Sequence, residues 1–237
     1  MLEFTIVKVL GAMFTPDFNM ANSLRIANIA NKLLGDRLDG EPTLLPIPQD
    51  APADIPRITL KSSDNLLSLS IAPLRTNLEF KIPLKSIVTM IDYSSYYSNM
   101  SKFFVEFSAD LNLKVQRLGY ATDRLIIKED ALSYMMKRFC NMDQISKGRP
   151  FYNPKRFEIH SLKNYGWEGF QINSWIRLKY ILTKIEDEIK PSLLVHNDLN
   201  TLSYEEDPGA EFKAKDIEKY FDKIPDHLNQ ILNLYFA

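Results

Sequence analysis

The hydrophobic pattern of this chain changes period along its length, and this alternation constrains the fold more than any other feature. Alternating apolar positions predict eight strands, over residues 2–10, 57–61, 66–72, 77–82, 113–119, 156–162, 171–185 and 192–202. Apolar residues at helical spacing predict four helices, over residues 15–35, 83–107, 130–139 and 213–235. Pro225 lies within the last helix and is expected to kink or split it.

The first predicted helix has recognisable ends. Thr15, Pro16 and Asp17 form a typical start, because a hydroxyl can cap free N–H groups and proline is tolerated in the first turn. Gly35 supplies the left-handed residue that ends many helices. Five prolines follow between residues 36 and 56, and they predict a long extended loop.

The predicted elements repeat in order, because each half reads strand, helix, three strands, helix. We therefore expect an α+β protein with two halves, residues 1–110 and 111–237, that form one compact unit. Short consecutive strands favour an antiparallel sheet with helices packed on one face, which leaves the other face free to bind. The element order resembles the duplicated saddle of the TATA-box-binding protein in topology, and topology alone carries no function.

Composition indicates a folded protein of a reducing compartment. Hydrophobic residues make up 45% of the chain, enough to form a core, and 29 basic residues nearly balance 30 acidic ones. No overall field therefore attracts nucleic acid or an anionic membrane. Cys140 is the only cysteine, so no internal disulfide forms, and no run of about 18 apolar residues predicts a membrane helix. We expect a cytoplasmic protein without a cofactor.

Three segments carry a resemblance to a known family. Residues 56–80, 117–127 and 193–206 read PRITLKSSDNLLSLSIAPLRTNLEF, RLGYATDRLII and LLVHNDLNTLSYEE. In order and character they resemble a sporadically distributed bacterial family of uncharacterised proteins. The resemblance implies a bacterial or phage-related source and assigns no activity.

The best candidates for metal or acid–base chemistry are Glu158, His160, His196 and Asp198. No phosphate-binding loop, dinucleotide fingerprint, zinc-protease motif or nucleophile elbow is present. Residues two apart on a strand share a face, so each histidine pairs with a carboxylate, and neighbouring strands would bring four ligands together. The alternative is that all four are solvated or hydrogen-bonded sheet residues.

Other reactive side chains have simpler interpretations. We read His227, on the last helix, as structural. Lys137 and Arg138 would make Cys140 more reactive, although a cysteine that follows Phe139 is usually a small buried hydrophobe. The run that contains Arg117, Tyr120, Asp123 and Arg124 would either line a pocket or form cross-strand ion pairs.

Charge asymmetry is the most informative feature for function. A basic-aromatic loop over residues 147–156 mixes cations with rings; its candidate binding residues are Lys147, Arg149, Phe151, Tyr152, Lys155 and Arg156. Residues 186–226 hold twelve acidic and five basic side chains. A bipolar molecule of this kind is suited to self-association or to a charged protein partner, and a solvated loop beside an acidic helix would look the same.

These features favour a non-enzymatic interaction protein that binds a protein partner through a sheet face or through the basic-aromatic loop. Arg149, Phe151 and Tyr152 are the expected anchors, because arginine and aromatic side chains dominate hot spots. Two alternatives stay open: a metal-assisted hydrolase that uses the two histidine–carboxylate pairs, and a protein that binds single-stranded nucleic acid through the loop.

Overall fold

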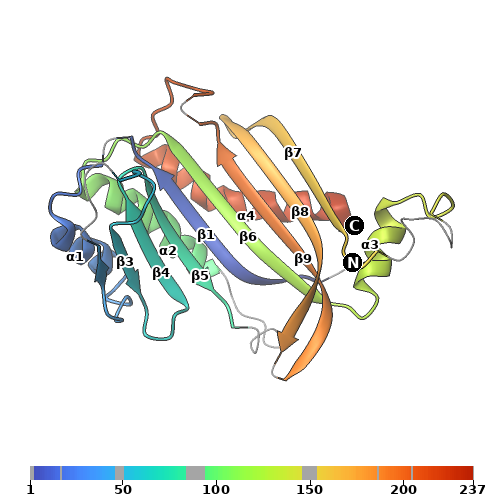
Figure 1. Ribbon diagram of the computed structural model, residues 1–237. Helices are drawn as coiled ribbons and strands as arrows, with labels where there is room; N and C mark the ends of the chain where they lie inside the picture. The colour runs from blue at the N-terminus through green and yellow to red at the C-terminus, as the bar shows by residue number, and fades with distance from the viewer. Residues whose placement is uncertain are drawn as a thin grey trace.

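The chain forms one antiparallel sheet of nine strands in the order β2-β3-β4-β5-β1-β6-β9-β8-β7 (Figure 1). The computed structural model describes residues 3–16, 18–45, 51–83, 94–145, 154–185, 187–203 and 205–236. The strands are β1 Thr5–Phe14, β2 Thr43–Leu44, β3 Ile58–Lys61, β4 Leu67–Ala72, β5 Arg75–Lys81, β6 Arg117–Ile127, β7 Glu158–Trp167, β8 Phe170–Ile185 and β9 Glu188–Thr201. The helices are α1 Ser23–Leu33, α2 Ser94–Asp110, α3 Ala131–Phe139 and α4 Ala214–Phe236. The predicted α+β class and antiparallel sheet are confirmed.

β1 and β6 lie side by side at the centre of the sheet. Gly11 of β1 is opposite Leu78 of β5 on one side and opposite Tyr120 of β6 on the other. The sheet therefore runs without a break from the strands of the N-terminal part to those of the C-terminal part.

Helices α2 and α4 lie against each other and cover one face of the sheet (Figure 1). The rings of Phe104 and Phe221 stack between them with centroids 4.7 Å apart. A Cβ on Gly11 would come within 2.7 Å of the Phe104 ring, so only glycine lets α2 lie this close to β1. Apolar side chains that point to the helices from neighbouring strands are fully buried, and this layer is the main core.

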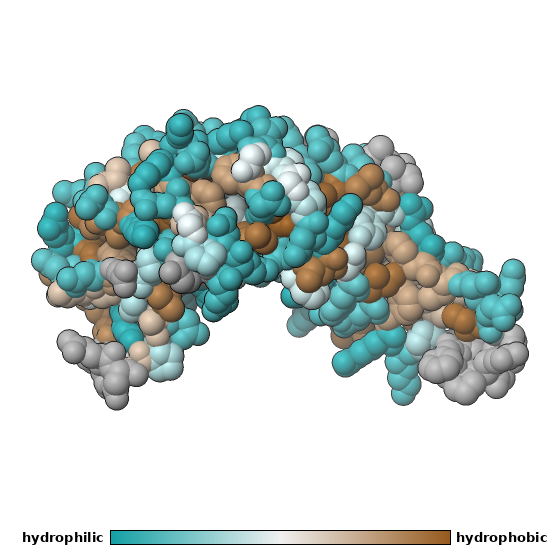
Figure 2. Space-filling view, turned by 90° about the horizontal axis from the view of Figure 1, so that it is seen from above, coloured by the Kyte–Doolittle hydropathy of each residue, from teal (hydrophilic) through white to brown (hydrophobic). Residues whose placement is uncertain are grey.

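The opposite face of the sheet is open and hollowed. In Figure 1 the strands lie in front of α2 and α4, and Figure 2 shows the same molecule from above as an arch with a hollow beneath it. The two views together place the uncovered face on the hollow side. A right-handed twist accumulates across a wide sheet and gives it this curvature.

The first strand and first helix differ from the prediction. β1 continues to Phe14, and α1 begins at Ser23, where the Asn22 side chain accepts a hydrogen bond from the Arg25 N–H at 3.1 Å. The start expected at Thr15 is wrong, because β1 pairs with β5 and β6 up to Phe14, and the Thr15 N–H extends this pairing by donating at 3.0 Å to the Leu74 carbonyl in the turn between β4 and β5. The predicted end is confirmed, since Gly35 has φ 65°.

Several other boundaries also move. β2 lies within the predicted loop, so four strands rather than three separate α1 from α2. β6 extends to Ile127 because it pairs with β1 on one side and with β9 on the other. α4 continues through the buried Pro225 and is not split. Residues 84–93 of the second predicted helix lie outside the described residues.

Candidate functional site

The candidate site is the open face, which we define as the sheet side chains that point away from α2 and α4. One cross-strand row spans six neighbouring strands, and its members are His160, Arg177, His196, Asp123, Lys8 and Lys81. These residues come from segments far apart in the sequence, and the register alone brings them into line.

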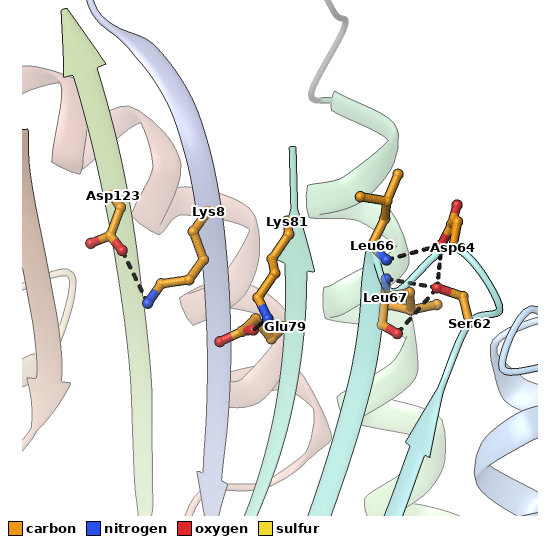
Figure 3. Close-up of polar contacts among 8 residues, drawn as sticks. All are labelled: Lys8, Ser62, Asp64, Leu66, Leu67, Glu79, Lys81 and Asp123. Carbon is orange, nitrogen blue, oxygen red and sulfur yellow. Dashed lines mark hydrogen bonds and ion pairs between the residues drawn. The ribbon is translucent and has the colours of Figure 1, made fainter. Parts of the chain in front are cut away.

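Asp123 is the centre of this row. Its carboxylate accepts hydrogen bonds from Lys8 Nζ at 3.0 Å and from His196 Nδ1 at 2.5 Å. Burial alone would raise the pKa of Asp123, but the bonds from His196 and Lys8 outweigh it, and the pKa is lowered. Figure 3 shows the Lys8–Asp123 pair, with the neighbouring Lys81–Glu79 pair, in front of β6, β1 and β5. The negative charge at the centre is thus neutralised.

A second polar group lies at the β7 edge of the same face. Glu158 accepts from His160 Nε2 at 3.2 Å and pairs with Lys179 Nζ at 3.3 Å. The hydrogen bond from His160, followed by that from Lys179, lowers the pKa of Glu158. Because this group is exposed, its ion pairs contribute little to stability.

Arginine side chains lie over aromatic rings at two separate places on the open face. The guanidinium carbon of Arg177 is 5.2 Å from the ring centroid of Trp175 on β8. At the other place, Phe14 is opposite Arg75 on β5 and Arg117 on β6, with guanidinium carbons 5.8 and 5.0 Å from its ring centroid. These distances fit cation–π contacts, which favour these positions of the arginine side chains over the rings.

Between the two arginine–aromatic groups runs a row of neutral side chains. Its members across the sheet are Asn164, Asn173, Asn200, Gly119, Ala12, Asn77, Ser70, Thr59 and Thr43. A Cβ on Gly119 would lie 2.5 Å from Asn200 Oδ1, so glycine leaves room for this amide at the middle of the sheet. Amide and hydroxyl groups in a row can donate to and accept from a bound molecule.

The structure does not bring the four predicted metal ligands together. Glu158 and His160 lie on β7 and His196 and Asp198 on β9, while Arg177 of β8 stands between the two histidines. All four side chains already have partners: Glu158 contacts His160 and Lys179, His196 bonds to Asp123, and Asp198 accepts from Asn200 at 2.7 Å. Within the described residues, no group of three or more His, Cys, Asp or Glu side chains is arranged to hold a metal ion.

The basic-aromatic loop falls largely outside the described part of the chain. Lys147, Arg149, Phe151 and Tyr152 lie there, while Lys155 and Arg156 are described and exposed. The loop therefore stays a prediction.

The remaining predicted residues divide between the two sides of the sheet. Arg117 and Asp123 belong to the open face, whereas Tyr120 and Arg124 are buried on the helix side. Cys140 is a half-buried free thiol.

The sequence interpretation did not single out Phe14, Trp175 or Arg177. The alternation of Trp175, Arg177 and Lys179 along one strand was a visible signal, since alternate residues share a face. Phe14 had no such signal, because its arginine neighbours come from two other strands.

No protein-family model matches this sequence, and no curated protein is significantly similar to it. No helix in the described ranges is both long and apolar enough to cross a membrane. The chemistry of the open face therefore gives the main indication of function.

Proposed function

We propose that this chain is a non-enzymatic interaction protein and that its partner, another protein, binds to the open face. The observation that supports the proposal is a wide, hollowed sheet face that presents two arginine–aromatic groups with polar side chains between them. Partly buried aromatic and arginine residues ringed by polar groups are typical of binding hot spots.

The charges of the open face favour a protein partner over nucleic acid. Carboxylates are interspersed with the cations at Glu79, Asp123, Glu158 and Asp198, and they would repel a phosphate backbone. Arg75 and Arg177 have no carboxylate within ion-pair distance among the residues that the structure describes. Acidic side chains of a partner would complement these two cations. Hydrogen bonds to the row of neutral side chains across the sheet would determine how the partner is aligned on the open face.

Single-stranded nucleic acid is the second candidate, because the arginine-flanked rings of Phe14 and Trp175 would also accept stacked bases. Its binding would weaken steeply with salt as phosphate contacts release counterions. The two histidine–carboxylate pairs give no support to a hydrolase, because β8 lies between them.

We also propose that residues 1–110 and 111–237 are equivalent halves of a duplicated architecture. The support is topological: β5 returns to pair with β1, and β9 returns to pair with β6, before α2 and α4 respectively. Both halves then contribute equally placed strands to the open face. The bacterial family resemblance and the cytoplasmic location stay predictions.

The experiment compares a Trp175→Ala/Arg177→Ala variant with the wild type by affinity purification from the native host. We expect a stoichiometric protein partner with the wild type and its loss with the variant, since truncation of a hot spot costs about 2 kcal/mol, roughly thirty-fold in affinity. A Lys102→Ala/Glu106→Ala variant on α2, which removes an exposed ion pair from the helix side, is the matched control.

Three outcomes would contradict the proposal. Retention of the partner by the open-face variant would place the interface elsewhere, and a large fall in its melting temperature would make the two residues structural. Recovery of RNA or DNA in place of a protein would favour the second candidate.

A further inference from the structure

A pocket on the other side of the sheet is separate from the open face. It has a volume of about 410 Å³ and lies between the helix-facing side of β7 and β8 and the last turns of α4. Ser161, Lys163 and Tyr165 alternate along β7 on its wall, and Ser174 of β8 lies opposite Lys163. Volumes of roughly 300 to 1,000 Å³ are typical of small-molecule sites.

One end of the pocket is a connected polar group. The Tyr165 hydroxyl is 2.7 Å from His227 Nε2, and it is the donor when His227 Nδ1–H faces Gln230 Oε1, an acceptor at 3.4 Å. Trp167 stacks on the imidazole with ring centroids 4.7 Å apart. Burial lowers the pKa of His227, which keeps the ring neutral and able to accept this hydrogen bond near pH 7. His227, which the sequence interpretation took as structural, therefore helps to fix the wall of a pocket.

The rest of the pocket combines a cation with apolar walls. Lys163 is exposed at the mouth and has no carboxylate within ion-pair distance among the described side chains. Ile176 is 3% exposed at the base, while Ile231 and Leu234 of α4 form the opposite wall. Leu234 is 82% exposed, which places it at the rim.

We propose that this pocket binds a small amphipathic carboxylate. Its hydrocarbon or aromatic part lies against Ile176 and Ile231, and its carboxylate lies between the Lys163 ammonium and the Ser161 hydroxyl, while the Ser174 hydroxyl is hydrogen-bonded to Tyr165. A charge-assisted hydrogen bond to lysine fixes the orientation, and burial of the apolar part supplies the rest of the affinity. An amine of the same shape is repelled by Lys163.

The test uses tryptophan fluorescence, because the chain has two tryptophans and Trp167 adjoins the pocket through His227. In a Trp175→Phe background, Trp167 is the only reporter. The probes are 4-phenylbutyrate and octanoate, with 4-phenylbutan-1-ol and 4-phenylbutylamine as uncharged and cationic controls. We expect saturable fluorescence changes with the carboxylates, and roughly ten-fold weaker or no binding of the controls.

Two variants test the geometry. Lys163→Gln removes the cation and Leu234→Glu adds a negative charge at the rim, and both positions are exposed, so folding is retained. We expect each to weaken carboxylate binding roughly ten-fold, whereas Lys102→Gln on α2 leaves it unchanged. Absence of a saturable change with both carboxylates, equal affinity for the amine, or full binding by Lys163→Gln would overturn the proposal.

Discussion

Asp123 and His227 show how single ionisable side chains connect elements on the two sides of the sheet. Asp123 links β6 to β1 and β9 through Lys8 and His196 on the open face, and its pKa is lowered despite its burial. His227 links α4 to β7 on the helix side, where desolvation lowers its pKa. The surroundings thus stabilise the ionised form of Asp123 and the neutral form of His227.

We expect His227 to make the folded state less stable as pH falls below about 6.5, its ordinary pKa. The pKa of His227 is lower in the folded state than in the unfolded chain. At a pH between these two pKa values the unfolded chain binds more protons, so the free energy of unfolding decreases as the pH falls through the folded-state pKa. Above about pH 6.5 the residue contributes no pH dependence. Thermal unfolding of the wild type and of His227→Gln between pH 7.5 and 5 measures this effect; parallel pH profiles would refute it.

At the scale of elements, α4 is attached to the sheet by hydrogen bonds as well as by its apolar face. Arg124 of β6 is 2% exposed and donates to the Leu228 carbonyl at 3.3 Å and to Asn229 Oδ1 at 2.8 Å. Tyr220 of α4 donates to the Leu199 carbonyl of β9 at 2.8 Å. These bonds fix the position of α4 along the sheet, which packing alone would leave free to shift.

We expect Arg124→Met to lower the free energy of unfolding by about 3 kcal/mol, because it removes charge-assisted bonds from a buried side chain to the Leu228 carbonyl and to Asn229 Oδ1. Arg25→Met, an exposed change on α1, is the control and should cost less than about 0.5 kcal/mol. Urea unfolding measures both. Equal midpoints for the two variants would show that Arg124 contributes no net stability.

Elements whose own pattern is strong could be predicted from the sequence, and contacts between distant strands could not. The apolar spacing of Ile217, Tyr220 and Phe221 predicted α4, because all three face one core. The start at Thr15 was wrong because β1 pairs with β5 and β6 as far as Phe14, and no local pattern records these distant partners. For the same reason the grouping of Arg75 and Arg117 around Phe14 depends on register across three strands.

At the scale of the whole molecule, the two parts meet along β1 and β6 and along α2 and α4. The turn that connects them contains Asn112, an exposed residue with φ 50°. Every strand of one part pairs within that part, apart from the β1–β6 pair. Non-covalent contacts between β1 and β6 and between α2 and α4 therefore join the two parts more extensively than the connecting turn does.

We expect fragments 1–112 and 113–237 to form a stable complex when produced together, because β1–β6 pairing and the Phe104–Phe221 stack require no connection of the chain. Co-purification through a tag on one fragment, with a circular dichroism spectrum like that of the intact chain, measures this. Fragments that fold separately, or that never associate, would contradict it.

The central position of β1 has a consequence for biosynthesis. β1 is translated before the strands it pairs with, and it can pair with β5 as soon as the first half is synthesised. Its other edge has no partner until β6, residues 117–127, leaves the ribosome. During that interval the nascent chain presents an unpaired edge and the apolar side of α2. We therefore expect the time between translation of the two halves to be when this protein most needs a chaperone.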